Sequence, residues 1–231
     1  MSRPARRGAA ITALGAVIVL GLVTPRAGAA VSARDRAILA AGVVQRADVP
    51  AGWVSQKQTV GSGARYKGIP ACKSFATVLN ATTLTVPHRL SPEFSDPASA
   101  TRTTLAANTA YAFHDATAAG RYLDAYRAAR VAACLTQALQ PAVKGSVPGA
   151  SPTVSVVPLT DLAGLGDDAV GYRLTVTASS QGTSQTLYAD IVDVRVGRAV
   201  LGFTFQNLGA DLPSAVSIIR PPSNRVAPLA T

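Results

Sequence analysis

Hydrophobic and polar residues alternate along the last third of the chain. The alternation runs through 170–177, continues in 187–196 after a loop of Ser, Gln and Gly, and returns in 199–206. Because successive side chains of a strand point to opposite faces, a period of two predicts β-strands. Gly197 and Arg198, between the last two segments, suit a tight hairpin turn. The pattern therefore predicts an antiparallel meander of at least three strands.

A second period-two segment precedes a helical one. Positions from 99 to 113 alternate, which predicts a long strand. Asp115 suits an N-cap, and the alanine-rich stretch after it predicts the main helix over 116–139, ended by Pro141. Apolar residues at helical spacing predict shorter helices elsewhere in the chain, at 32–44 (with Ser32 as its cap), 70–81 and 212–219.

These elements indicate an α+β fold. We expect an antiparallel sheet with a C-terminal meander, packed on one face against one long helix and shorter helices. The expected division of the chain is a signal peptide at 1–29, a helical lead-in at 30–44, a single α+β domain at 45–220 and a flexible tail at 221–231.

The first thirty residues have the pattern of an export signal. Three arginines occur among the first seven residues, 9–23 is largely apolar, and small residues end the stretch at Ala29. We expect a secretory signal peptide cleaved after Ala29, with an uncleaved anchor as the alternative and the export route left open. No cysteine precedes Cys72, so we expect no lipid anchor near the N-terminus.

Charge and composition exclude several classes of protein. The 231 residues include 22 Lys and Arg against 12 Asp and Glu, and removing 1–29 takes away four arginines and leaves a net charge of +6. The arginines are dispersed, so we expect no nucleic-acid binding. A hydrophobic content of 48% is too high for a disordered chain. With two cysteines and two histidines, neither a four-thiolate zinc site nor any other cofactor is expected.

Export changes what the two cysteines mean. Cys72 and Cys134 are an even pair in an oxidising compartment, which predicts one disulfide, with Cα atoms about 4.4–6.8 Å apart. A reactive thiol is the alternative, but no CxxC spacing supports it.

Acidic residues supply two weak candidates for chemistry. Glu93 is the only glutamate, and with Asp96 it would make the carboxylate pair of a glycosidase, although 91–97 is more typical of an irregular edge. Asp167 and Asp168 could contact a cation, but two carboxylates are too few for calcium, so we expect a solvated turn.

The histidines and serines supply no stronger candidate. His88 and His114 have no visible link to either cysteine, and His114 is expected at the surface beside a helix cap. Ser62 lies between two glycines but lacks the Gly-x-Ser-x-Gly pattern of hydrolases. We therefore lean against an enzyme and predict no catalytic and no metal-binding residues.

The order of several short motifs resembles a known group of proteins. These motifs are 47–53, 71–73, 113–116, 133–135, 165–173 and 194–198. In order and spacing they are similar to exported sensor-like domains of actinobacteria, related to the extracytoplasmic domain of mycobacterial receptor kinases and to small envelope lipoproteins. The resemblance implies a helix-flanked antiparallel sheet, a disulfide and a ligand cleft. It defines no functional residues, and the chain has neither a kinase region nor a lipidated cysteine after its leader.

Three functions remain open. We favour an exported, non-catalytic binding or sensor-like module of the cell envelope, without a stable membrane span after cleavage. The alternatives are a small secreted hydrolase and a purely structural envelope protein. The positive charge predicts an apolar or anionic ligand or partner. A cleft above about 300 Å³ would favour a small-molecule role over the structural one. Candidate lining residues are Tyr122, Tyr126, Tyr172, Phe203 and Phe205.

Overall fold

The computed structural model describes residues 31–58, 66, 68–97, 105–128, 130–146, 151–180, 183–208 and 215–231. The described helices are α1 (Ala33–Gly42), α2 (Lys73–Thr85), α3 (Ala116–Arg127), α4 (Arg130–Ser146) and α5 (Val216–Val226). The described strands are β1 (Val54–Gln56), β2 (His88–Leu90), β3 (Glu93–Ser95), β4 (Leu105–Ala112), β5 (Ser151–Pro158), β6 (Asp168–Ser180), β7 (Thr183–Val196) and β8 (Ala199–Leu208). The predicted signal peptide lies outside these residues, so export and cleavage remain predictions.

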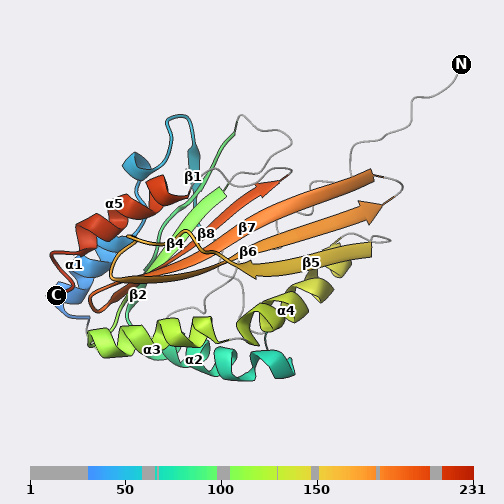
Figure 1. Cartoon of the computed structure of the whole chain (residues 1–231). Coiled ribbons are helices and arrows are strands. Elements are labelled where there is room, and N and C mark those ends of the chain that lie inside the picture. Colours follow the sequence, from blue (N-terminus) through green and yellow to red (C-terminus); the bar gives the residue numbers. More distant parts are fainter. Residues whose placement is uncertain are drawn as a thin grey trace, which may run out of the picture.

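The strands of the described chain form one antiparallel sheet (Figure 1). Its order is β1-β3-β4-β8-β7-β6-β5, and β2 pairs with β4. The predicted α+β class and the C-terminal meander β6-β7-β8 are therefore confirmed. The tight turn between β7 and β8 needs glycine for two reasons: Gly197 has φ +55°, and a Cβ there would lie 2.2 Å from the Ala230 carbonyl oxygen.

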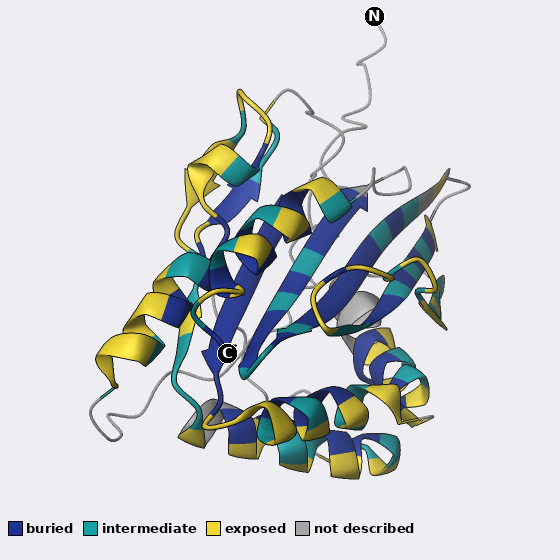
Figure 2. Cartoon of the chain, turned by 60° about the vertical axis from the view of Figure 1, so that its left-hand side comes forward, coloured by how far each residue is buried: buried dark blue, intermediate teal, exposed yellow. Residues whose placement is uncertain are grey.

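Helices cover both faces of the sheet, which corrects the expected one-sided packing (Figure 2). Helices α2, α3 and α4 cover one face, and α1 and α5 cover the other. The reason lies in the central strands, whose residues are apolar or small on both faces. In β7, Ile191 faces α2–α4, while Val192 and Val194 face α1 and α5. A sheet that is apolar on both faces must be covered on both.

The expected single long helix is two helices. Helix α3 ends at Arg127 because the backbone of Ala128 leaves the helical region (φ −55°, ψ 131°), and α4 then begins at Arg130. The break lets α4 lie along β5, while α3 crosses β6, β7 and β8. Pro141 does not end the helix, since α4 continues to Ser146. No helix in the described part of the chain is long and apolar enough to span a membrane.

The C-terminal residues pack against the domain. Helix α5 continues through Pro221 and Pro222, because Pro222 and the apolar residues on either side of the proline pair are buried, which outweighs the missing backbone hydrogen bonds. Arg225 donates to both carboxylate oxygens of Asp48, at 2.7 and 2.8 Å. Ala230 is buried, and its carbonyl accepts the Arg198 N–H. The structure therefore differs from the flexible tail expected over 221–231.

The N-terminal helix is also part of the fold. Ser32 caps α1 as predicted, accepting the Asp35 N–H at 3.0 Å. The buried Asn108 of β4 accepts the Val44 N–H at 2.7 Å and donates to the Gly42 carbonyl at 2.8 Å. These bonds attach the end of α1 to the centre of the sheet.

Candidate functional site

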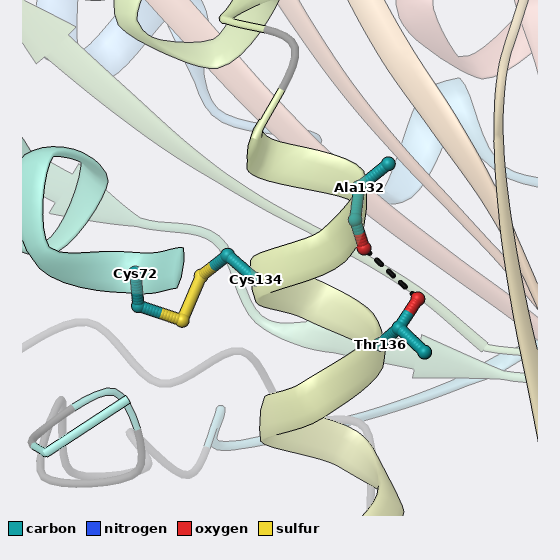
Figure 3. The surroundings of a disulfide bond; sticks show 4 residues. All are labelled: Cys72, Ala132, Cys134 and Thr136. Atoms are coloured by element: carbon teal, nitrogen blue, oxygen red, sulfur yellow. Dashed lines mark hydrogen bonds between the residues drawn. A yellow bond between two sulfur atoms is a disulfide. The ribbon is translucent and has the colours of Figure 1, made fainter. Parts of the chain in front are cut away.

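The predicted disulfide is confirmed. The Cα atoms of Cys72 and Cys134 lie 4.7 Å apart, and both residues are fully buried. As Figure 3 shows, the bond joins the segment that opens α2 to the middle of α4, where Thr136 donates to the Ala132 carbonyl at 2.9 Å. The disulfide thus fixes two of the three helices that cover one face of the sheet.

A small cavity lies between these helices and the sheet. Its volume is about 50 Å³. Strands β4, β7 and β8 line it on one side, and helices α2, α3 and α4 line it on the other. The described lining residues are Gln58, Tyr66, Phe75, Leu79, Ala107, Asn108, Thr109, Tyr111, Tyr122, Tyr126, Leu135, Ile191, Asp193, Gly202, Phe203 and Thr204.

Aromatic rings form one wall of the cavity. Tyr111 of β4 lies 5.7 Å from Tyr122 of α3, measured between ring centroids, and Tyr122 lies 5.2 Å from Tyr126. Phe75 of α2 meets Tyr126 edge to face at 4.8 Å, and Tyr66 meets Phe75 in the same way at 5.7 Å. The spacing of Tyr122 and Tyr126, four residues apart on one helix, places both rings on the same face. Their hydroxyls share a hydrogen bond of 3.2 Å.

Asp193 is the ionisable acid of the cavity. It is 3% exposed and lies on β7, opposite Gly202 of β8. A Cβ on Gly202 would lie 2.7 Å from an Asp193 carboxylate oxygen, so the glycine makes room for the carboxylate. Burial raises the pKa of Asp193 to about 8. No hydrogen bond or ion pair joins Asp193 to another residue in the described part of the chain.

The Gln58 Oε1 has no hydrogen-bond partner among the described residues. The Tyr111 hydroxyl makes no hydrogen bond of good geometry to them either, although its interaction with the Tyr122 side chain partly lowers its pKa. Burial, and then the nearby charge of Asp193, raise the pKa of Tyr111 well above its usual value. The described lining contains no Lys, Arg or His. The cavity therefore combines aromatic rings with unsatisfied acceptors and has no positive charge of its own.

The candidate lining residues divide between the two faces of the sheet. Tyr122 and Tyr126 line the cavity. Tyr172 packs in the same core, but its hydroxyl donates to the Tyr126 carbonyl. Phe203 is also part of the described lining, although its ring belongs to the core on the opposite face, where it stacks on Phe205 at 6.1 Å. Phe205 belongs to that opposite core and does not line the cavity. Their shared face was predicted correctly, but it is the face that α1 and α5 cover.

Asp193 is not among the candidate residues predicted from the sequence, although the pattern of β7 contains a signal for it. Leu187, Ala189 and Ile191 occupy alternate positions of β7 and are buried against α2–α4. Asp193 continues that series, so the period of two places an acid on a buried face. Asp190, three residues earlier, falls on the other face of β7 and is paired with Arg173 through two hydrogen bonds of 2.8 Å.

The carboxylates considered for catalysis have structural partners. Glu93 is buried in β3 and accepts a hydrogen bond from Gln56 of β1. The stretch expected as an irregular edge is thus a strand at its centre, because Glu93 finds this partner on the neighbouring strand. Asp167 accepts the Gly197 N–H at 2.6 Å, and Asp168 pairs with Arg127.

The histidines occupy separate places. His114 is exposed and lies 2.9 Å from Asp115, which caps α3 by accepting the Ala118 N–H. His88 contacts the Tyr111 ring at 5.7 Å, and its Nδ1 lies 3.1 Å from the Val86 carbonyl oxygen. None of the acids and histidines considered from the sequence lines the cavity. Among the described residues, no group of three His, Cys, Asp or Glu could hold a metal ion.

The cavity is smaller than the cleft expected for a small-molecule site. Its volume of about 50 Å³ lies well below the range of about 300–1,000 Å³ that holds drug-sized ligands. It is several times the roughly 10–15 Å³ that one ordered water requires. The space therefore suits a few waters or one polar group of a ligand.

Comparisons with known proteins find similar structures but no sequence relatives. No family model matches the chain, and no curated protein matches it. The chain is similar to the extracellular domain of PknH from Mycobacterium tuberculosis, with a TM-score of 0.43 and 10% identity over 87% of this chain and 97% of that one. It is also similar to LpqN, involved in cell envelope biogenesis of the same organism, with a TM-score of 0.29 and 11% identity over 78% of each chain. Both are proteins of the kind that the order of motifs in the sequence resembles.

Proposed function

We propose that this protein is an exported, non-catalytic binding module of the cell envelope and that its binding site is the cavity between the sheet and α2–α4. The observation that carries the proposal is a cavity that brings the Asp193 carboxylate and the unpartnered Gln58 Oε1 together beside tyrosine rings, with no cation in its described lining. Buried polar groups without partners are costly, and a ligand that supplied the missing hydrogen bonds would remove that cost. The leader-like sequence at 1–29 and the disulfide support export.

The size of the cavity limits what it holds. It has room for one end of a ligand, and the rest of such a ligand would lie outside it. The same small volume favours a second function, that of an envelope interaction protein that binds no small molecule.

A hydrolase has less support. The cavity contains one acid and no histidine in its described lining, so it offers no nucleophile with a base and an orienting partner. We expect Glu93→Gln and His114→Ala to leave binding unchanged. Loss of a measured hydrolysis in either folded variant would instead establish the enzyme.

Protein-observed NMR with a panel of small cationic, neutral and anionic fragments tests the site. We expect at least one fragment to shift the signals of the Tyr111, Tyr122 and Tyr126 rings. Tyr111→Phe, which removes one hydroxyl and keeps the ring, should weaken the binding of that fragment. If no fragment shifts these signals, the proposal that the cavity binds a small ligand is wrong, and the function of an envelope interaction protein is favoured instead.

A further inference from the structure

The unsatisfied atoms of the cavity have a common character. Asp193 offers a carboxylate, Gln58 offers its Oε1, and the Tyr111 hydroxyl can accept or donate. No cation among the described residues lines the cavity to neutralise the acid. A ligand that satisfies this set must therefore bring donors, and a positive charge if the carboxylate is ionised.

The aromatic wall favours the same kind of group. Tyrosine rings attract cations to their faces, and the attraction grows where water is excluded. Tyr111, Tyr122 and Tyr126 form a continuous row with centroid spacings of 5.7 and 5.2 Å, and Asp193 lies close enough to raise the pKa of all three, after the effect of burial. An anion would face this acid without compensation.

We propose that the cavity binds the protonated primary amino group of a small amine, with Asp193 as its counter-ion and the tyrosine row as its wall. This inference rests on the proposed function and specifies its ligand class. A primary ammonium has three donors and no acceptor, which matches three acceptors, and it is small enough for a cavity of about 50 Å³. The expectation of an apolar or anionic ligand was based on the net charge of the chain, whereas the described lining of this cavity contains an acid and no base.

Asp193 also gives the binding a distinctive dependence on pH. The titratable groups around it in the described lining are Tyr66 and the tyrosines of β4 and α3, and its strand neighbours are Val170 and Gly202. The tyrosines of β4 and α3 stay neutral below pH 9, because burial raises their pKa. With a pKa of about 8 for Asp193, affinity for an amine should rise about a hundredfold from pH 6 to pH 9, as the carboxylate ionises. A neutral ligand that accepts a hydrogen bond from the protonated carboxyl group of Asp193 would instead lose affinity as the pH rises from 6 to 9.

Isothermal titration calorimetry with n-butylamine, 1-butanol and butyrate at pH 6, 7, 8 and 9 tests the proposal. We expect butylamine to bind best and to tighten with pH. Asp193→Asn should weaken the binding of butylamine at pH 9 at least tenfold and abolish its dependence on pH. Asp124→Asn, the same change at an exposed site on α3, should leave both the affinity for butylamine and its dependence on pH unchanged. Nα-acetyl-lysine amide and phosphoethanolamine distinguish a lysine side chain from a lipid headgroup as the source of the amine.

Each outcome decides a different point. If butanol or butyrate binds as tightly as butylamine or more tightly, the proposal that the ligand is an amine is wrong, but the cavity remains a binding site. Butylamine binding that is unchanged in Asp193→Asn, or independent of pH, would overturn the role of Asp193. If none of the probes binds at any pH, while the NMR fragment panel still shifts the tyrosine signals, only the proposal that the ligand is an amine is wrong. If the panel is also silent, the proposed function fails with it.

Discussion

The buried carboxylate of Asp193 should make the fold less stable as the pH rises. Its pKa is about 8 in the folded protein, against 3.8 for an ordinary aspartate. Below pH 3.8 both the folded and the unfolded states carry the proton, so the group makes no difference. Between these two values the unfolded chain releases the proton and the folded chain keeps it, and the free energy of unfolding falls. Above about pH 8 both states are ionised and the loss is complete.

The size of this effect follows from the two pKa values. Each unit of difference corresponds to about 1.4 kcal/mol. The group should therefore lower the free energy of unfolding by about 4 kcal/mol at pH 7 and by about 5–6 kcal/mol above pH 8. These values are large beside the total stability of about 5–15 kcal/mol typical of a domain.

Asp193→Asn removes the titration while keeping nearly the same shape. We expect the variant and the wild type to be similarly stable near pH 4 and the variant to be more stable by several kcal/mol at pH 8. Urea unfolding followed by circular dichroism at steps between pH 4 and pH 8 measures this. The informative quantity is the difference between the two proteins at each pH, because other titrating groups cancel.

Asp124→Asn is the matched control. Asp124 is exposed on α3 and does not line the cavity, so Asp124→Asn should change the free energy of unfolding by less than about 1 kcal/mol at every pH of the series. A flat curve for Asp193→Asn as well would refute the reasoning, because it would mean that the Asp193 carboxylate is ionised and solvated in the folded protein. A curve with the opposite slope would mean that an unrecognised cation holds it.

Three further predictions concern the surroundings of the cavity. Changing Cys72 and Cys134 together to serine should lower the free energy of unfolding by about 4 kcal/mol on the chain-entropy model for a loop of 62 residues, as measured by urea unfolding. Arg225→Met should cost about 3–5 kcal/mol, because it leaves a nearly buried carboxylate unpaired, and limited proteolysis should then cut within α5. Gly202→Ala should keep the fold but displace the carboxylate of Asp193, and calorimetry should show at least tenfold weaker butylamine binding; undiminished binding would contradict the placement of that group.

The sequence predicted the elements whose signals are local. The N-caps Ser32 and Asp115 work through a single hydrogen bond to a backbone N–H three residues ahead, so the cap can be recognised from neighbours in the chain. The hairpin at Gly197 is also local in its two residues. The disulfide was predictable for a different reason: only two cysteines exist, so there was one pairing to consider.

The errors come from contacts between distant segments. The end of α3 at Arg127 is not visible in an alanine-rich sequence, because Arg127 contacts Asp168, 41 residues away. The helix through Pro221 and Pro222 persists because the residues around it are buried against the sheet. Glu93 finds its partner 37 residues earlier in β1. Such contacts form only when the sheet has brought the segments together.

The same distinction applies to the candidate site. Tyr122 and Tyr126 share a helix face because they are four residues apart, whereas the alternation over 99–113 contains Tyr111 but does not indicate what its side of the strand meets. Phe203 is part of the described lining, but its ring and that of Phe205 lie on the face away from the cavity. Alternation gives two faces and does not say which one carries the cavity.

The contrast between two acids of β7 is the strongest argument that the cavity has a function. Asp190 is 4% exposed and is held by a bidentate bond to Arg173, which is how a buried acid is accommodated for structural reasons. Asp193 is equally buried and has no such partner in the described chain, which lowers the free energy of unfolding at neutral pH. The disulfide contributes about 4 kcal/mol, which is large enough to offset that loss. Any apolar residue of similar size would pack there without that cost. A fold that tolerates an unpaired acid beside three tyrosines, and fixes the covering helices with a covalent bond, has the properties expected of a preorganised binding site.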